Sequence, residues 1–257
     1  MINMRPLPAS LFTGLLTGLA LAACSSTPDL SASVATGNEA TTTEVESLVS
    51  DAPSFAGYAP QGQTYTVVAV SLLDPTSLPT SGEMKAITSE QGEFMDWLRL
   101  NGGLVAAGPV VPPRDNSSVR QLMFFDTEDS DAALERCCEG PASGTGLYGT
   151  EASRFVTTTD LSQVGANVLS GSGSALRPYV IVTGPSSLAM TATFGKMGSL
   201  MLCQGDCVDG VLRGRSLAIL DCTDVDDARL FMGEVCSSTE GLSYHAWIGP
   251  VAFSALR

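Results

Sequence analysis

An internal repeat is the feature that most restricts how this 257-residue chain can fold. Residues 122–126 (LMFFD) resemble residues 217–221 (LAILD), an offset of 221 − 126 = 95 residues. The pairs Gly146-Leu147 and Gly241-Leu242 keep this offset, since 241 − 146 = 95. A shared ungapped spacing in a strand-like segment and in a glycine turn indicates a tandem duplication.

The first copy alternates strand patterns with helix patterns. Apolar and β-branched runs predict strands over residues 65–72, 104–107, 119–125 and 147–157. Apolar residues at three- and four-residue steps predict helices over 82–101 and 131–138. The order β-α-β-β-α-β is the split βαβ pattern of ferredoxin-like folds. We therefore expect an α+β protein made of two such units.

The first 23 residues have the pattern of an export signal. Arg5 supplies a positive start, and the apolar run over 11–22 is too short to span a membrane comfortably. The run ends in Leu21-Ala22-Ala23-Cys24, which resembles the lipobox of bacterial lipoproteins. That resemblance implies cleavage before Cys24 and an anchor of two or three acyl chains, palmitate among them. An ordinary secretory signal is the alternative.

The resemblance also predicts a place in the cell. Ser25 is not the aspartate that tends to retain lipoproteins in the inner membrane. We expect a lipid-anchored protein of the cell envelope, on the outer membrane facing the periplasm rather than on the inner membrane. Residues 24–63 contain no Lys or Arg and show no hydrophobic period, so we expect an acidic, disordered tether. The first unit then covers 64–160, a Gly/Ser linker 161–176 and the second unit 177–257.

Charge and residue counts exclude several functions. The formal charge is 13 − 27 = −14, so the clustered Lys and Arg of a nucleic-acid surface are missing. His245 is the single histidine, which excludes a multi-histidine metal site. No pattern in the sequence predicts a cofactor. The expected partners are the membrane, through the lipid, and either a small organic ligand or an envelope protein.

Two segments resemble the YciI-like (YCII-related) proteins of the dimeric α/β-barrel superfamily. These are Gly102-Gly103-Leu104-Val105-Ala106-Ala107-Gly108-Pro109 and Gly146-Leu147-Tyr148, with Gly140-Pro141 at a matching place between them. Family members pair their βαββαβ sheets face to face as homodimers. The resemblance implies two tandem ferredoxin-like units that form an intrachain dimeric α/β-barrel pseudo-dimer, monomeric as a whole.

The same resemblance implies that the family chemistry is lost. The family's proposed catalytic histidine and aspartate fall on Gln91 and Gly140 in the first copy, and on Ser186 and Val235 in the second. None of these side chains can act as acid or base near neutral pH. We expect a noncatalytic lipoprotein that binds a small ligand or a protein partner. The alternatives are a lyase, isomerase or hydrolase that uses other residues on a small organic acid, and a cell-wall glycan binder.

Four residues are candidates for a ligand pocket: Gln91, Tyr148, Ser186 and His245. Gln91 can equally be a buried, hydrogen-bonded core amide, and a lone histidine is often structural. The acidic run 221–227 lacks the glycine-turned spacing of a calcium loop. We interpret it as the start of a helix capped by Thr223.

Six cysteines follow Cys24, and an exported protein can form disulfides. Cys203 and Cys207 flank an expected turn, which predicts a short local bridge between them. A zinc site built from Cys203, Cys207 and His245 lacks the usual paired Cys-x-x-Cys, so no metal is expected. The pairing of Cys137, Cys138, Cys222 and Cys236 cannot be deduced from the sequence.

Overall fold

The computed structural model describes residues 60–73, 81–111, 119–141, 145–236 and 239–256, so the export signal, Cys24 and most of the tether lie outside the described residues. The chain is α+β and all its strand pairs are antiparallel. The strands are β1 (Gln63–Leu72), β2 (Leu104–Val111), β3 (Val119–Phe125), β4 (Tyr148–Thr157), β5 (Leu176–Pro185), β6 (Met201–Cys207), β7 (Arg215–Leu220) and β8 (Ser243–Pro250). They close into a barrel in the order β1-β3-β2-β8-β5-β7-β6-β4.

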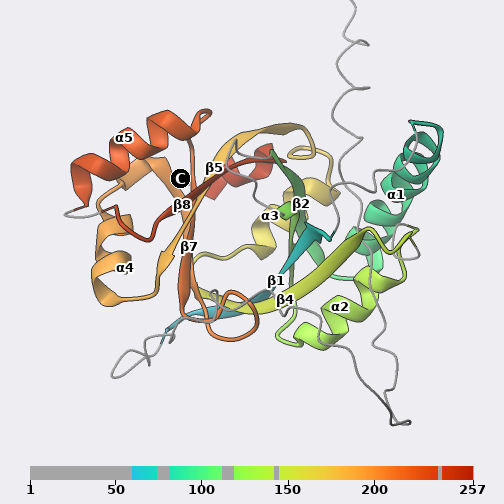
Figure 1. Cartoon of the computed structure of the whole chain (residues 1–257), viewed down its shortest axis with the longest axis horizontal. Coiled ribbons are helices and arrows are strands. Elements are labelled where there is room, and N and C mark those ends of the chain that lie inside the picture. The colour runs from blue at the N-terminus through green and yellow to red at the C-terminus, as the bar shows by residue number, and fades with distance from the viewer. Residues whose placement is uncertain (1–59, 74–80, 112–118, 142–144, 237–238, 257) are drawn as a thin grey trace, which may run out of the picture.

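Helices cover the outside of this barrel. The elements are α1 (Ser81–Asn101), α2 (Ser130–Cys138), α3 (Ser162–Leu169), α4 (Leu188–Gly195) and α5 (Val225–Val235), with 3-10 turns η4 (Gly198–Leu200) and η5 (Val251–Leu256). Figure 1 shows α1 and α2 beside the first four strands, and α4 and α5 beside the last four. Among the described helices, none combines the length and the apolar character needed to cross a membrane.

The two halves of the barrel share one strand order. The first half reads β4-β1-β3-β2 and the second β8-β5-β7-β6, so each strand has its counterpart at the same place. The expected order β-α-β-β-α-β is present in each half. Asp129 caps α2 and Asp224 caps α5, and 224 − 129 = 95 is the repeat offset again. The repeat in the sequence is therefore also a repeat of structure.

The barrel interior is filled by apolar side chains from both halves. Successive strand residues point to opposite faces, so alternate residues such as Tyr65 and Val67 face inward. The ring of Trp247 lies 5.9 Å from those of Phe124 and Tyr179. Its Nε1 donates a hydrogen bond of 3.0 Å to the carbonyl oxygen of Gly108. One core thus joins the two halves.

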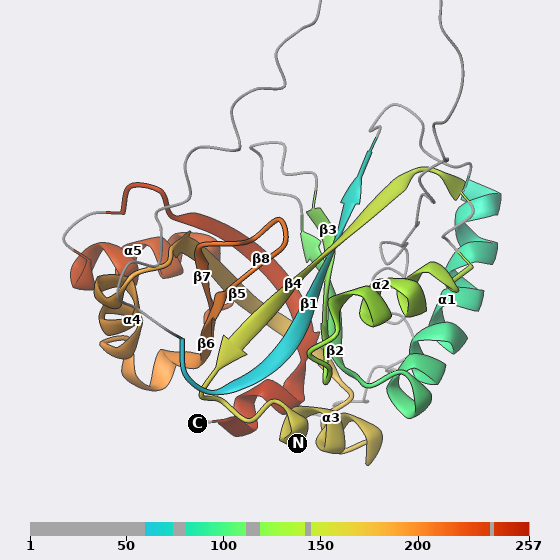
Figure 2. The same ribbon diagram turned by 90° about the horizontal axis from the view of Figure 1, so that it is seen from below.

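The segment 161–176 is more than the expected linker. It contains α3, whose Val164 and Val168 are buried in the barrel core. Figure 2 shows α3 beside η5 at one end of the barrel, which the two elements cover together. Leu161, Val164 and Val168 follow helical spacing, but the glycines and serines that come directly after them dominate the composition of the segment.

Strand β2 is longer than predicted. It was expected to end at Gly108-Pro109, but it continues to Val111 because its pairing passes from β3 to β8. Gly108 permits this exchange, since a Cβ atom there would collide with the carbonyl oxygen of Ile248 on β8. The close approach of the two halves at this seam therefore requires a glycine.

Candidate functional site

The structure distributes the four predicted pocket residues over different parts of the barrel. Gln91 on α1 and Tyr148 on β4 are buried on the helix-covered side of the first half. Ser186 follows β5 in the second half. His245 on β8 is half-buried, pairs with Ile181, and lies two residues from Trp247, on the interior face. These four side chains do not line one pocket.

Gln91 is buried, as one of the two interpretations expected, but its amide is not satisfied. The residue is 3% exposed and lies on the same helix stripe as Met95 and Leu98. Among the described residues, neither Nε2 nor Oε1 of Gln91 has a hydrogen-bond partner. At the second family position, a Cβ on Gly140 would press against the ring of Phe94. The first half therefore has an apolar layer that contains the unsatisfied amide of Gln91, and the buried Oε1 of Gln121 on β3 also has no partner among the described residues.

Tyr148 is an ionisable side chain of this layer. Burial raises the pKa of Tyr148, and the nearby charge of Arg120 opposes that shift. The phenol therefore stays protonated at neutral pH and can act only as a hydrogen-bonding group there.

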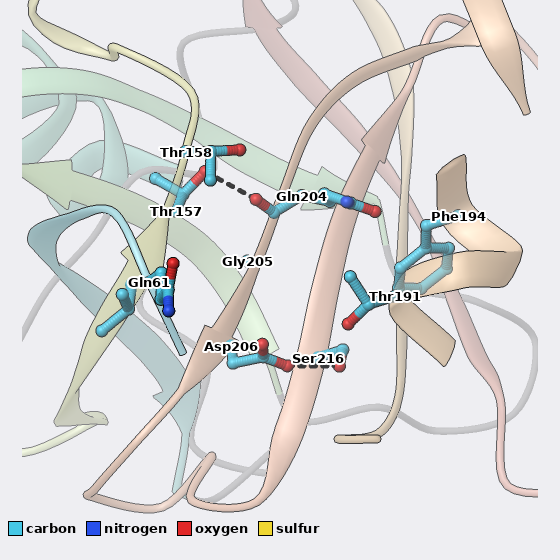
Figure 3. Close-up of a pocket in the computed structure, with 10 residues that line it drawn as sticks. Gln61, Thr157, Thr158, Thr191, Phe194, Gln204, Gly205, Asp206 and Ser216 are labelled. Atoms are coloured by element: carbon cyan, nitrogen blue, oxygen red, sulfur yellow. Dashed lines mark hydrogen bonds between the residues drawn. The ribbon is translucent and has the colours of Figure 1, made fainter. Parts of the chain in front are cut away.

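A polar cavity lies on the second half, where it meets the first. It has a volume of about 40 Å³ and lies between the end of β4, strands β6 and β7, and helix α4 (Figure 3). Strand alternation places Gln204 and Asp206 on the same face of β6, and Ser216 on β7 is the cross-strand partner of Asp206. The polar side chains in its lining come from Gln61, Thr157, Thr158, Thr191, Gln204, Asp206 and Ser216.

Asp206 is the charged group of this cavity and is only 4% exposed. Its Oδ1 accepts hydrogen bonds from Ser216 Oγ at 2.5 Å and from Ser186 Oγ at 2.6 Å. A carboxylate can be buried only when hydrogen bonds or charges compensate for lost water, and these hydroxyls do so. Ser186, predicted as a pocket residue, thus stabilises Asp206 by donating a hydrogen bond to it.

The turn expected between Cys203 and Cys207 is instead the middle of strand β6, and this strand carries Asp206. A polar residue at every second position of a strand marks one polar face. That alternation in residues 204–206 was the available clue.

The predicted bridge between Cys203 and Cys207 is wrong. Both cysteines are free thiols, and four residues along a strand separate their Cα atoms by about 13 Å, too far for a disulfide. Burial raises the pKa of Cys203 to about 11 and that of Cys207 to about 12. Within the described residues, no group of three or more His, Cys, Asp or Glu side chains could hold a metal ion.

The acidic run before α5 has structural roles. Asp224, and not Thr223 as expected, is the N-cap, and its carboxylate accepts a hydrogen bond of 2.6 Å from the backbone of Asp226. Asp221 forms an ion pair with Arg177, whose guanidinium carbon lies 4.8 Å from the ring centre of Tyr179. Asp224 therefore caps α5, and the ion pair of Asp221 links the end of β7 to β5.

A larger hollow lies between α1, α3 and the start of β5. Its volume is about 300 Å³, and exposed Leu100, Leu169 and Leu176 line it. Asp96 and Arg99 form an ion pair of 2.6 Å at its edge. This surface is apolar with a charged margin.

Comparison with known proteins leaves the family open. No protein-family model matches the chain, and no curated protein matches it. A solved "putative monooxygenase" of Fusobacterium nucleatum shares 8% identity over 74% of this chain and 93% of its own, with a TM-score of 0.43. A solved "putative chlorite dismutase" shares 10% identity over 76% of this chain and 97% of its own, with a TM-score of 0.47. A solved "putative monooxygenase" of Lactobacillus acidophilus shares 9% identity over 74% of this chain and 94% of its own, with a TM-score of 0.37. Likenesses of this size assign neither a family nor an activity.

Proposed function

We propose that this protein is a noncatalytic ligand-binding protein, with its site in the polar cavity beside Asp206. The observation that carries the proposal is that the barrel interior is filled and apolar, while the cavity under α4 is open and polar. The barrel interior is filled with aromatic and aliphatic side chains, whereas the cavity under α4 is lined by a buried carboxylate, two amides and several hydroxyls. A few polar groups that converge on a small cavity are typical of a binding site.

The chemistry of the cavity favours binding over catalysis. Among the residues that line it, Asp206 is the one titratable group. A serine nucleophile needs an adjacent base, such as an imidazole, that can take its proton. The hydroxyls of Ser186 and Ser216 instead donate to Asp206, in an arrangement that stabilises the carboxylate.

We further propose that the two halves are tandem ferredoxin-like units that form a pseudo-dimeric α/β-barrel within one chain, as the YciI-like resemblance implies. The shared strand order, and the offset of 95 residues between the caps Asp129 and Asp224, support this. One sheet with two helices leaves a face to bury, and a second copy can cover it.

The cellular setting is proposed from the sequence. Lipidation at Cys24 would anchor the protein in the cell envelope, with the outer membrane favoured by Ser25. A Cys24→Ala variant should leave the membrane fraction and enter the soluble fraction. Unchanged fractionation of that variant would refute the anchor.

Ligand binding is tested by thermal shift of the full chain against a library of small metabolites. A ligand that binds only the folded state must raise the melting temperature. A shift that disappears in the Asp206→Asn variant would place the ligand in the cavity. If no small molecule raises the melting temperature, the proposal fails, and a protein partner becomes the better explanation.

A further inference from the structure

The two halves of the barrel meet at two seams that are built in the same way. Strand β2 pairs with β8 at one seam, and β6 pairs with β4 at the other. Ala107 on β2 pairs with Met123 on β3. Gln204 on β6 pairs with Ala218 on β7, and 218 − 123 = 95 is the repeat offset. In both strands the next residue is a glycine, at which a Cβ atom would collide with a carbonyl oxygen of the opposite half.

Each seam carries a hollow, and the walls of the two hollows are counterparts. The polar cavity beside Asp206 lies between α4, β6 and the end of β4. The larger hollow lies between α1, β2 and the end of β8, and α3 and the start of β5 extend its wall. Each helix follows the first strand of its half, and β2 and β6 are the second strands. The larger hollow thus has the position in the first half that the polar cavity has in the second.

The lining of the larger hollow is mainly apolar. Its volume is about 300 Å³, against about 40 Å³ for the polar cavity. Leu100, Leu169 and Leu176 in its lining are 73%, 52% and 49% exposed. Covering exposed apolar side chains with another apolar group is favourable, because both are removed from water. The hollow therefore suits a hydrocarbon chain rather than a small polar group.

One basic and one acidic side chain belong to this lining. Arg99 Nη1 and Asp96 Oδ1 form an ion pair of 2.6 Å, but the Arg99 side chain is 24% exposed and that of Asp96 is 73% exposed. An ion pair with so exposed a partner contributes little, so Asp96 does not hold the guanidinium firmly. Two nitrogens of Arg99 have no partner among the described residues. Of these, Nε is buried, whereas Nη2 is accessible and can donate to a ligand.

We infer that the larger hollow binds a small carboxylic acid with an apolar chain, as its anion. The chain covers Leu100, Leu169 and Leu176, and the carboxylate accepts a hydrogen bond from Arg99 Nη2. An anion is favoured over a cation because Arg99 is less exposed than Asp96, and a charge interacts more strongly where less water surrounds it. This site shares no lining residue with the cavity beside Asp206, so it is a second site and does not depend on the first.

The test is calorimetric titration of the full chain at neutral pH with octanoate, octanol and octylammonium, which share one alkyl chain, and with acetate, which lacks it. Octanoate should bind more tightly than the other three. Arg99→Gln should weaken octanoate binding about tenfold, because it removes a hydrogen bond from a charged donor. Asp96→Asn should strengthen octanoate binding by up to about fivefold, because it removes a competing carboxylate.

The matched controls are Arg229→Gln and Asp226→Asn. Arg229 and Asp226 form an exposed ion pair of 3.3 Å on α5, with the same spacing of three residues, and neither lines the hollow. Both variants should leave octanoate binding unchanged.

Four results would each overturn the inference. Octylammonium binding as tight as that of octanoate would mean that Asp96 is the recognised charge. Equal binding of octanol would mean that no charge is recognised. Octanoate binding that is unchanged in Arg99→Gln would place the ligand elsewhere, and absence of octanoate binding would refute the site itself. The cavity beside Asp206 is tested separately by the metabolite library, so either proposal can fail without the other.

Discussion

Gln91 has a buried amide whose two polar atoms make no hydrogen bond with any residue that the structure describes. Leaving such a group unsatisfied costs about 1 to 3 kcal/mol, so replacing it with an apolar side chain of similar shape should remove that cost. We expect Gln91→Met to raise the free energy of unfolding by about 1 kcal/mol or more, measured by urea denaturation. Gln163→Met, at an exposed position, should have little effect. A loss of stability in Gln91→Met would show that the amide has a partner, such as a bound water.

The buried thiols of Cys203 and Cys207 should make stability depend on alkaline pH. Burial raises their pKa from 9.0 to about 11 and about 12, and for Cys207 the charge of Asp206 adds to the shift. The folded state therefore keeps protons that the unfolded state loses. The stabilisation is fully present below about pH 9 and is lost as the pH rises towards about 11 for Cys203 and about 12 for Cys207, by up to about 1.4 kcal/mol per pH unit for each thiol.

Urea denaturation at about pH 8 and at about pH 10.5 measures this effect. The Cys207→Ala variant should show a smaller loss between the two pH values than the unmodified chain, whatever its absolute stability. The same loss in both proteins would mean that burial of this thiol does not cause the pH dependence.

At the scale of elements, the start of α5 separates two capping hypotheses. The Asp224 carboxylate accepts a hydrogen bond from the first turn, whereas Thr223 precedes the cap and is exposed. Loss of an N-cap costs about 1 kcal/mol. We expect Asp224→Ala to lower the free energy of unfolding by about that amount, and Thr223→Ala to change it by less than about half as much. The reverse order in chemical denaturation would restore Thr223 as the cap.

The elements also show where sequence patterns succeed. The strand predicted over residues 119–125 is confirmed as β3 with the same bounds, and its apolar run 122–125 is buried on both faces. The helix predicted over 82–101 begins one residue earlier, at Ser81. In contrast, α3 was assigned to a linker because its helical spacing is short and is followed by glycine and serine.

At the scale of the whole molecule, both halves share the core of the barrel interior, so they should unfold as one unit. Trp247 in the second half packs against Phe124 of the first, and its Nε1 binds the Gly108 carbonyl oxygen. The Trp97→Phe variant leaves Trp247 as the single tryptophan, because the chain has two. We expect Trp247 fluorescence and far-UV circular dichroism of this variant to give the same urea midpoint. Separate transitions would mean that the halves fold independently.

The sequence by itself determined the repeat and the order of strands and helices in each copy. These features depend on local periodicity and on spacing along the chain, both of which can be read directly. Only the tertiary structure decided that the interior is filled, that β6 separates Cys203 from Cys207, and that Ser186 and Ser216 meet at Asp206. Those facts depend on which strand lies beside which, and pairing across the barrel is set by the packing of distant segments, not by the residues of any one of them.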